Sequence, residues 1–549
     1  MRRRAGTASA DPLTEGKEAY RQKRWREARD LLTAAEAAAP LAPADYEILA
    51  TADFLLSVDV EGPAIWERAH HVFFERGDIA RAARAAFWSG MALLLRGEMA
   101  RANGWFARGQ RMLDDAGLDC VERGYLRIPN AIRAGHQGDP SVAYRIHEET
   151  IAIARRFGDE DLIIFARQGQ GRSLLLSGDI ESARAVMDEV MVAITTGHVS
   201  PIVLGYVYCS VIVGLRQVYD VGRAREWTAA LERWCESQSE LEMYRGECLV
   251  HKAEVLEHTG DWAKALEQMR NARERLSSPP PHPSAGVAAY HEGELYRLSG
   301  RFAEAEAAYV KSGELGRSPQ PGLALLRLEQ GRLESASASV RRALSEAQGH
   351  TARAEILPGY VEIMLAAGDS AAAQGGVAEL AAIAAATASD YLHAAACQAQ
   401  GATLLAEGDV QRALQNLREA AEIWQGLDAT YHAARTRVLI GQACRELHDE
   451  ESARLEVEVA RKALTRLGAV PDLKRIDKLF PQLGRPDHPL SRREVEVAEL
   501  VAQGLSNKVI AGKLFVSERT VESHVKNVCD KLGFNSRAQV ASWVARRRF

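Results

Sequence analysis

Cysteine is scarce in this sequence of 549 residues, and its seven copies are scattered. They stand at positions 120, 209, 235, 248, 397, 444 and 529. Disulfide frameworks and structural zinc sites need cysteines in paired, regular spacings, so we expect neither kind of site and no metal ligands. A reducing compartment, the cytoplasm, fits this use of cysteine best.

Long apolar runs are missing too. The most apolar stretch, residues 201–215, is shorter than the roughly 20 residues that a membrane-spanning helix needs, and it predicts a buried helix instead. The three arginines at positions 2–4 precede Ala, Ser and Asp rather than an apolar core, so we expect no signal peptide. Residues 1–11 are predicted to be disordered.

Motifs of catalysis are also absent. The sequence contains no phosphate-binding GxxxxGKS or GxxxxGKT loop, no HExxH, no GxSxG and no paired CxxC. A short Gly-Gln-Gly at residues 169–171 falls inside a helical pattern and is only a very weak nucleotide-binding signal. We therefore expect no enzymatic activity, no catalytic residue and no cofactor.

Charge is divided unevenly along the chain. The net charge is −5, but residues 485–549 hold 12 Lys and Arg against 7 Asp and Glu, a balance of +5, and the remainder carries −10. A basic C-terminal segment suits a phosphate-rich partner, whereas an acidic body does not.

The acidic body repeats one pattern: a helix ends at a turn residue, usually Gly, and Ala follows five residues later. The turns fall at Gly97, Gly138, Gly178, Tyr219, Gly260, Gly300, Gly331, Gly368, Gly408 and His448. The alanines are Ala102, Ala143, Ala183, Ala224, Ala265, Ala305, Ala336, Ala373, Ala413 and Ala453. Gly permits a tight turn and Ala a close approach of two helices, so the pattern predicts helix pairs that stack into a superhelix. Seven of the nine intervals are 40 or 41 residues.

These pairs resemble tetratricopeptide repeats (TPR), particularly residues 293–312 and 401–420, although the usual period is 34 residues. The resemblance implies an all-α fold in which residues 12–467 form a TPR-like α-solenoid. Its longer period implies longer helices or loops. Residues 20–40 fit the pattern as an earlier unit, whereas residues 41–96, with a turn at Gly77, predict only helices.

Proline-rich segments interrupt and end the array. Residues 277–286, SSPPPHPSAG, form either a hinge between two halves or an extended loop, and we favour the loop. A second interruption, SPQPG at residues 318–322, lies in a shortened interval. Residues 468–489 contain two Gly and four Pro and predict a linker, in which residues 473–480 could form a short helix.

Some side chains of the array have two interpretations. Several aromatics could line a ligand groove or fill the core, and we favour the core: Trp66, Phe73, Phe74, Trp88, Trp105 and Phe106. Four histidines could be ligands, but we favour solvated or locally bonded side chains: His70, His71, His251 and His258.

The last 60 residues predict four short helices. Ser491 and Glu494 form a capping box that opens the first, and Gly504 ends it. Ser506 caps the second, which we expect to bury Val509, Ile510 and Leu514. The chain turns at Phe515 and Val516, Ser517 caps the third helix, and Gly533 ends it; a fourth runs from 536 to 546. Two helices joined by so short a turn place the later one in a major groove of DNA.

This segment resembles the LuxR/NarL class of bacterial DNA-binding domains. The class pattern SNKxIAxxLxxSxxTVxxHxxxIxxKLxxxxR reads here SNKVIAGKLFVSERTVESHVKNVCDKLGFNSR. The resemblance implies that residues 490–549 form a small four-helix, helix-turn-helix domain that binds double-stranded DNA. Two positions depart from the pattern: Val509 stands where an acidic residue is frequent, and Cys529 where an aliphatic residue is usual.

Motif alignment assigns roles to individual residues of the domain. By resemblance to the class, base contacts fall on Glu522, Ser523 and Lys526. A carboxylate favours the amino group of cytosine, and Lys favours the acceptor atoms of guanine. Phosphate contacts by residue type are Lys508, Ser517, Arg519, Thr520, Asn527 and Lys531. A dimer contact is implied for Val540, Ala541 and Val544. The alternative for each polar position is a solvated face; Val521, Val525, Val528 and His524 are predicted to pack within the domain.

These expectations combine into one hypothesis: a cytoplasmic, bacterial-type transcription regulator that binds DNA, as a homodimer, through its C-terminal domain. The array would bind a peptide, protein or small-molecule effector that prefers one of its arrangements. The alternative is a TPR-like interaction scaffold that the C-terminal domain anchors to DNA. No membrane partner is expected.

Overall fold

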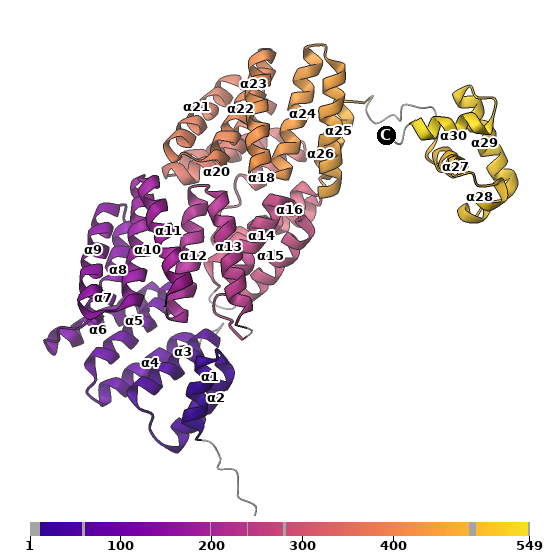
Figure 1. The fold of residues 1–549 in the computed structure, drawn as a ribbon. Coiled ribbons are helices and arrows are strands. Elements are labelled where there is room, and N and C mark those ends of the chain that lie inside the picture. The colour runs from indigo at the N-terminus through magenta and orange to yellow at the C-terminus, as the bar shows by residue number, and fades with distance from the viewer. Residues whose placement is uncertain are drawn as a thin grey trace, which may run out of the picture. The chain divides into compact units, whose positions relative to one another are not determined.

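The computed structural model describes residues 11–56, 61–197, 199–238, 240–277, 281–481 and 490–546. The described residues form thirty α-helices and no β-strand, which confirms the all-α prediction (Figure 1). The chain divides into two compact units, Met1–Asp472 and Leu473–Phe549. The predicted disorder of residues 1–11 falls on residues outside the described part, except for Asp11, which caps the first helix.

The helices of the first unit follow one another as antiparallel neighbours. The first half contains α1 Pro12–Arg21, α2 Trp25–Ala38, α3 Pro43–Leu56, α4 Glu61–Glu75, α5 Ile79–Leu95, α6 Met99–Asp115, α7 Glu122–Tyr125, α8 Ile128–His136, α9 Pro140–Phe157, α10 Glu160–Ser177, α11 Ile180–Thr196, α12 Pro201–Gln217 and α13 Val221–Glu236. The second half contains α14 Arg245–Thr259, α15 Trp262–Leu276, α16 Pro283–Leu298, α17 Phe302–Glu314, α18 Gly322–Glu329, α19 Leu333–Glu346, α20 Gly349–Ala366, α21 Ser370–Thr387, α22 Asp390–Glu407, α23 Val410–Gly426, α24 Thr430–Glu446 and α25 Glu450–Leu467.

The turn pattern of the sequence is confirmed throughout. All ten predicted turn residues have positive φ, from 56° at Tyr219 to 100° at Gly260. All ten predicted alanines are buried, as are the bulkier residues four positions further on, such as Met187 and Leu417. The small Ala lets the second helix of each pair approach the first, and the bulkier side chain fills the space between them.

An aspartate next to many of these turns starts the following helix. Asp179, Asp220 and Asp449 each accept a hydrogen bond from the backbone N–H three residues later, at 3.2, 3.2 and 3.0 Å. The turn residue thus ends one helix in the left-handed region, and its neighbour caps the next. Together they make one compact helix–helix connection.

Successive turns of the superhelix lie against each other, which the local repeat pattern does not predict. Ser389 Oγ donates to the carbonyl of Tyr219 at 3.1 Å, and Thr430 Oγ1 donates to the carbonyl of Thr259 at 3.0 Å. In Figure 1 the ends of α12–α15 accordingly lie beneath the last repeats of the array. The connection at Gly260 packs especially closely: a Cβ there would lie 2.7 Å from Leu467 Cδ2.

The proline-rich segments sit at the ends of helices that remain packed together. The predicted loop over residues 277–286 is shorter than expected, because residues 283–286 form the first turn of α16; residues 278–280 lie outside the described part. Arg273 Nε of α15 lies 2.6 Å from Glu292 Oε1 of α16, and this contact between the two helices favours a loop over a hinge. Near the second interruption, α18 has only eight residues, which accounts for the shortened interval. The predicted linker contains α26, Val470–Leu479; its residues 482–489 lie outside the described part.

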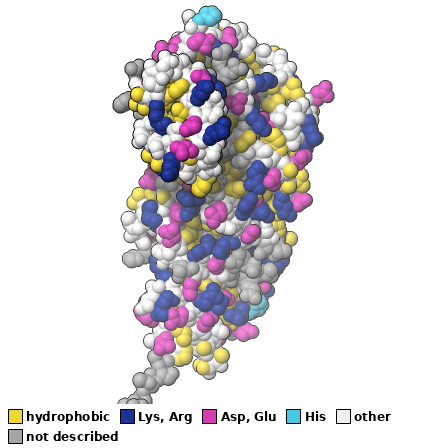
Figure 2. All heavy atoms as spheres, turned by 90° about the vertical axis from the view of Figure 1, so that its right-hand side faces the viewer, with side chains coloured by type: hydrophobic (Ala, Val, Ile, Leu, Met, Phe, Trp, Pro, Cys, Tyr) yellow, Lys and Arg dark blue, Asp and Glu magenta, His cyan; other side chains and the backbone are white. Residues whose placement is uncertain are grey.

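The interior of the array is mainly apolar, and it is rich in aromatic side chains at its N-terminal end. Trp66, Phe73, Trp88 and Phe106 are buried, as predicted, whereas Phe74 is 47% exposed. The apolar stretch 201–215 lies in the buried helix α12. Among the described residues, no helix combines the length and the apolar composition needed to cross a membrane. Figure 2 shows basic and acidic side chains interspersed on the visible face.

Candidate DNA interface

The C-terminal domain contains four helices, each started by the residue that the sequence indicates. They are α27 Arg492–Ala502, α28 Asn507–Leu514, α29 Glu518–Leu532 and α30 Arg537–Arg546. Ser491 and Glu494 form the predicted capping box: the Ser491 N–H donates to Glu494 Oε2 at 2.6 Å and the Glu494 N–H donates to Ser491 Oγ at 3.3 Å. Gly504 and Gly533 follow α27 and α29 with φ of 77° and 68°.

The connection between α28 and α29 is a tight turn. Ser506 caps α28, and Ser517 caps α29 by accepting from the Thr520 N–H at 3.1 Å. Between them Phe515 adopts a left-handed conformation with φ of 54°, and its side chain is 95% exposed. Two helices separated by only three residues form the predicted helix-turn-helix, with α29 in the position of the recognition helix.

One face of α29 is fixed in the domain core. Val521 and Val528 are buried, and Val525 and His524 are partly buried beside them. On α28, Ile510 is buried and Leu514 partly so. The expectation that Val509 is buried was wrong: it is 46% exposed, because it lies about 100° around the helix from Ile510.

The opposite face of α29 is open. Glu522, Ser523 and Lys526, the predicted base contacts, are all exposed, and none makes a hydrogen bond or ion pair with another described residue. Asn527 is exposed next to them. Because the core fixes the helix from behind, these polar groups project in a set direction with their hydrogen-bonding capacity unused.

The predicted phosphate contacts differ in how available they are. Lys508 and Arg519 are exposed in the first turns of α28 and α29. Ser517 and Thr520 bond to each other through their hydroxyls at 2.7 Å. Lys531 is engaged, because its Nζ lies 2.8 Å from Glu494 Oε2.

The pair formed by Lys531 and Glu494 holds two helices together. Burial opposes ionisation of the Glu494 carboxyl, but the hydrogen bonds from Lys531 and Ser491 outweigh it and lower its pKa. A phosphate that took Lys531 would leave this buried carboxylate without its cation. In this structure Lys531 braces the domain, and its role as a DNA contact stays a prediction.

The three residues of the predicted dimer contact have unequal exposure. Val540 and Val544 are buried in the domain's own core at 1% and 7% exposure, and Ala541 is partly exposed. A partner helix could therefore reach Ala541 without repacking the domain, but not the two valines. Dimerisation itself stays a prediction.

Two arginines that sequence reasoning passed over also brace the domain. Arg537 donates to Asn507 Oδ1 at 2.6 Å and to the Leu505 carbonyl. Arg493 donates to the Leu514 carbonyl at 2.7 Å, next to the turn. The bond between Arg537 and Asn507 could have been predicted from the sequence, because both residues belong to the LuxR/NarL class pattern.

A second polar site lies at the end of the array. Arg435 of α24 contacts Glu362 Oε1 at 2.7 Å and Asp472 Oδ1 at 3.5 Å, and the Tyr431 hydroxyl donates to Asp472 Oδ2 at 3.0 Å. These four side chains and Arg297 line a small recess. Asp472 is in the first turn of α26, so this network anchors the start of that helix.

Fold and site together define a helical-repeat protein that carries a helix-turn-helix domain. Residues 488–544 match the family model "Bacterial regulatory proteins, luxR family", and residues 245–315 match a tetratricopeptide-repeat model. The C-terminal domain is thus a luxR-family helix-turn-helix domain, and the array contains tetratricopeptide repeats. Both resemblances expected from the sequence are confirmed.

The relatives share only part of the chain. The transcriptional regulatory protein DegU of Brevibacillus brevis is 46% identical over 55 residues, which are 10% of this chain and 23% of DegU. The putative HTH-type transcriptional regulator Rv0890c of Mycobacterium tuberculosis (strain ATCC 25618 / H37Rv) is 39% identical over 127 residues, which are 23% of this chain and 13% of that protein. This chain therefore spans less than a quarter of the length of either relative.

Among solved structures, the APC/C hetero-tetramer Cut9-Hcn1 contains a chain that is 9% identical, with a TM-score of 0.37. The superposition covers 86% of this chain and 98% of that one.

Proposed function

We propose that this protein regulates transcription by binding double-stranded DNA in a sequence-specific manner through α29. The observation that carries the proposal is the open face of that helix: Glu522, Ser523 and Lys526 are exposed and unpaired, while the opposite face is buried. The luxR-family match of residues 488–544 supports the same reading. The carboxylate would accept from a cytosine amino group and Lys526 would donate to guanine.

Residues beside the open face would hold the sugar–phosphate backbone. Lys508 and Arg519 lie in the first turns of α28 and α29, where the positive ends of the helix dipoles also favour phosphate. Ser517, Thr520 and Asn527 would add hydrogen bonds. Binding as a homodimer would use the partly exposed Ala541 side of α30.

The array would supply the regulation. A peptide, protein or small-molecule effector on its concave surface must favour one arrangement of the repeats to alter DNA binding. The network around Arg435 offers a place where such a preference would reach α26: a ligand that competes for Arg435 or Tyr431 would detach Asp472 and the start of this helix.

Capture of chromosomal fragments by the purified full-length protein tests the proposal. We expect enrichment of one sequence with two-fold symmetry, and loss of that enrichment when Glu522 and Lys526 are both replaced by Ala. If the wild-type protein retains DNA but selects no sequence, sequence-specific regulation is excluded and the alternative, a scaffold anchored to DNA, explains the chain better.

A further inference from the structure

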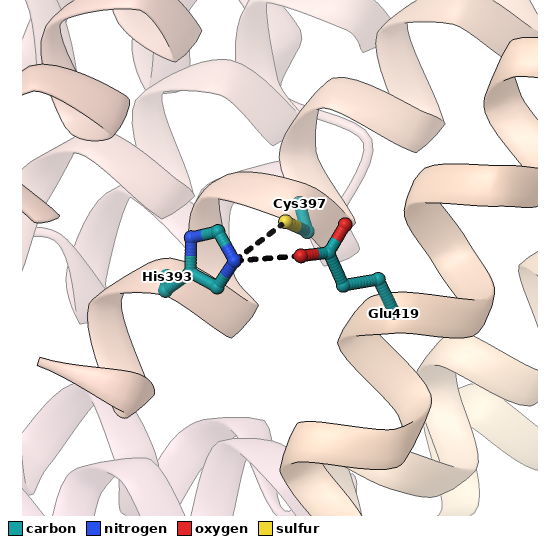
Figure 3. Close-up of side chains that lie close together, drawn as sticks. All are labelled: His393, Cys397 and Glu419. Atoms are coloured by element: carbon teal, nitrogen blue, oxygen red, sulfur yellow. Dashed lines mark hydrogen bonds and ion pairs between the residues drawn. The ribbon is translucent and has the colours of Figure 1, made fainter. Parts of the chain in front are cut away.

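Three side chains with metal-binding atoms meet in the last third of the array (Figure 3). His393 and Cys397 lie one turn apart on α22, and Glu419 reaches them from α23. His393 Nε2 is 2.8 Å from Glu419 Oε1 and 3.8 Å from Cys397 Sγ. All three candidate ligand atoms lie within 4.8 Å of one another.

The cluster is open on one side. The side chains of His393 and Glu419 are 50% and 54% exposed, whereas Cys397 is only 7% exposed. The sulfur therefore forms the floor of the site, and the imidazole and the carboxylate form its rim. An ion could enter from solvent without unfolding the repeat.

The spacings suit a tetrahedral ion. With bonds of about 2.0 Å to nitrogen and oxygen and about 2.3 Å to sulfur, neighbouring ligand atoms stand roughly 3.3 to 3.6 Å apart. The observed 2.8 and 3.8 Å lie on either side of these values. Small rotations of two half-exposed side chains would bring all three atoms to bonding distance.

The preceding repeat shows what this position contains when it is purely structural. Forty residues earlier the equivalent side chains are Arg353, Leu357 and Glu379. Arg353 Nη2 donates to Glu379 Oε2 at 2.8 Å, and Leu357 is fully buried beneath the pair. In the later repeat the glutamate is kept, the arginine becomes an imidazole and the leucine becomes a thiol. Both replacements introduce metal-binding atoms at adjacent places.

We propose that His393, Cys397 and Glu419 bind one divalent transition-metal ion, for which Zn²⁺ is the best match. A thiolate and an imidazole select against Mg²⁺ and Ca²⁺, which prefer oxygen ligands. On binding, Cys397 releases its proton to solvent, so the thiolate and the carboxylate balance the two charges of the ion. The fourth position faces solvent and would take water.

Cobalt titration of the untagged, full-length protein under reducing conditions tests this site, with CoCl₂ as the probe. A cysteine thiolate bound to Co²⁺ gives a charge-transfer band in the near ultraviolet. We expect this band to saturate at one equivalent per chain and to vanish when ZnCl₂ is added. Absence of the band at saturating Co²⁺ would overturn the proposal.

The matched control restores the residues of the preceding repeat. The double variant H393R/C397L recreates the Arg, Leu and Glu set that the array already packs forty residues earlier, so it is expected to fold with unchanged helicity and to lose the band. A band that survives in this variant would place the cobalt elsewhere and refute the assignment.

A further variant tests whether another thiol of the chain gives rise to the cobalt band. Cys235 of α13 and Cys248 of α14 interact with each other, and this interaction lowers the pKa of the Cys248 thiol, so Cys248→Ser tests the main competing source of thiolate. We expect it to leave the band intact.

Glu419→Gln keeps the shape of the side chain but removes its charge, and we expect it to weaken Co²⁺ binding at least tenfold; unchanged affinity would remove Glu419 from the site.

Discussion

His147 shows how closely single residues fit inside the array. Its ring packs on the backbone of Gly169, where a Cβ would lie only 2.2 Å from the ring. Burial lowers the pKa of His147 to about 4, and its Nδ1 has no hydrogen-bond partner among the described residues. The Gly-Gln-Gly at residues 169–171, which resembled a weak nucleotide signal, serves helix packing.

This histidine makes the stability of the array sensitive to acid. His147 binds a proton at about pH 6.5 in the unfolded chain and only near pH 4 in the folded chain. The stability that comes from keeping this imidazole neutral is therefore fully present above pH 6.5, and it is lost as pH falls towards 4. Between pH 7.5 and 5.0 the wild-type protein should lose about 2 kcal/mol more unfolding free energy than His147→Asn. Urea denaturation at both pH values measures this difference, and equal losses would contradict it.

Truncation of two side chains in the DNA-binding domain should change DNA binding in different ways. Lys508→Ala should weaken binding to every sequence and reduce the slope of log affinity against log salt by about 1, because one phosphate contact is lost. Glu522→Ala should instead change the preference at one base pair, by about 1–3 kcal/mol.

Fluorescence anisotropy with the captured sequence and with single-base variants of it measures both effects. Lys513→Ala is the matched control, since Lys513 is another exposed lysine of α28 that was not predicted to contact DNA. If Lys508→Ala and Lys513→Ala behave alike, the orientation assigned to the domain is wrong.

At the scale of helices, the turn at Gly178 depends on the backbone conformation of the glycine and not on its contacts with neighbouring side chains. Gly178 ends α10 with φ of 86°, and a Cβ at this position would touch no atom within 4 Å. Gly104 lies in the middle of α6, and a Cβ there would also touch nothing. The two glycines differ only in the backbone conformation that they occupy.

Alanine at these two positions should therefore have effects of opposite sign. Gly178→Ala should destabilise the protein by about 1–2 kcal/mol, because an L-residue is strained in the left-handed region. Gly104→Ala should stabilise it by up to about 1 kcal/mol, because Ala is the better helix former. Denaturant unfolding of both variants measures the contrast; a shared sign would contradict it.

At the scale of the whole array, the contact between superhelical turns should appear as coupling between distant residues. Gly260→Ala would press a Cβ against Leu467, and Leu467→Ala would relieve that pressure. The double variant should therefore lose about 1 kcal/mol less unfolding free energy than the sum of the single variants. Gly178→Ala combined with Leu467→Ala should be additive within about 0.5 kcal/mol. Additivity in the first pair would mean that the turns do not touch.

Sequence reasoning succeeded where the deciding interaction is local. The turns, including the unusual Tyr219 and His448, and the caps Ser506 and Ser517 are each set by a few consecutive residues. It failed at Val509, where a hydrophobic residue lies just off the buried face.

Interactions between segments that are far apart in the sequence could not be predicted from it. Lys531 meets Glu494 across 37 residues, and Thr430 meets Thr259 across 171. At the candidate metal site, His393 and Cys397 stand one helical turn apart in the sequence, but only folding brings Glu419 to them. A period of about 40 residues predicts that repeats stack; it does not predict how many repeats make one turn of the superhelix.

The stacking of superhelical turns also constrains how this chain could have evolved. Open repeat arrays can gain or lose a unit with little penalty, because each unit touches only its neighbours. Here the hydrogen bonds from Ser389 to Tyr219 and from Thr430 to Thr259 each join residues about 170 positions apart in the sequence. Both bonds therefore hold neighbouring superhelical turns in the same register. Deleting a single repeat between them would shift one turn along the other by one repeat and bring Thr430 towards Tyr219. The number of repeats is therefore fixed by the chain's contact with itself, and new variants should arise by substitution rather than by duplication of units.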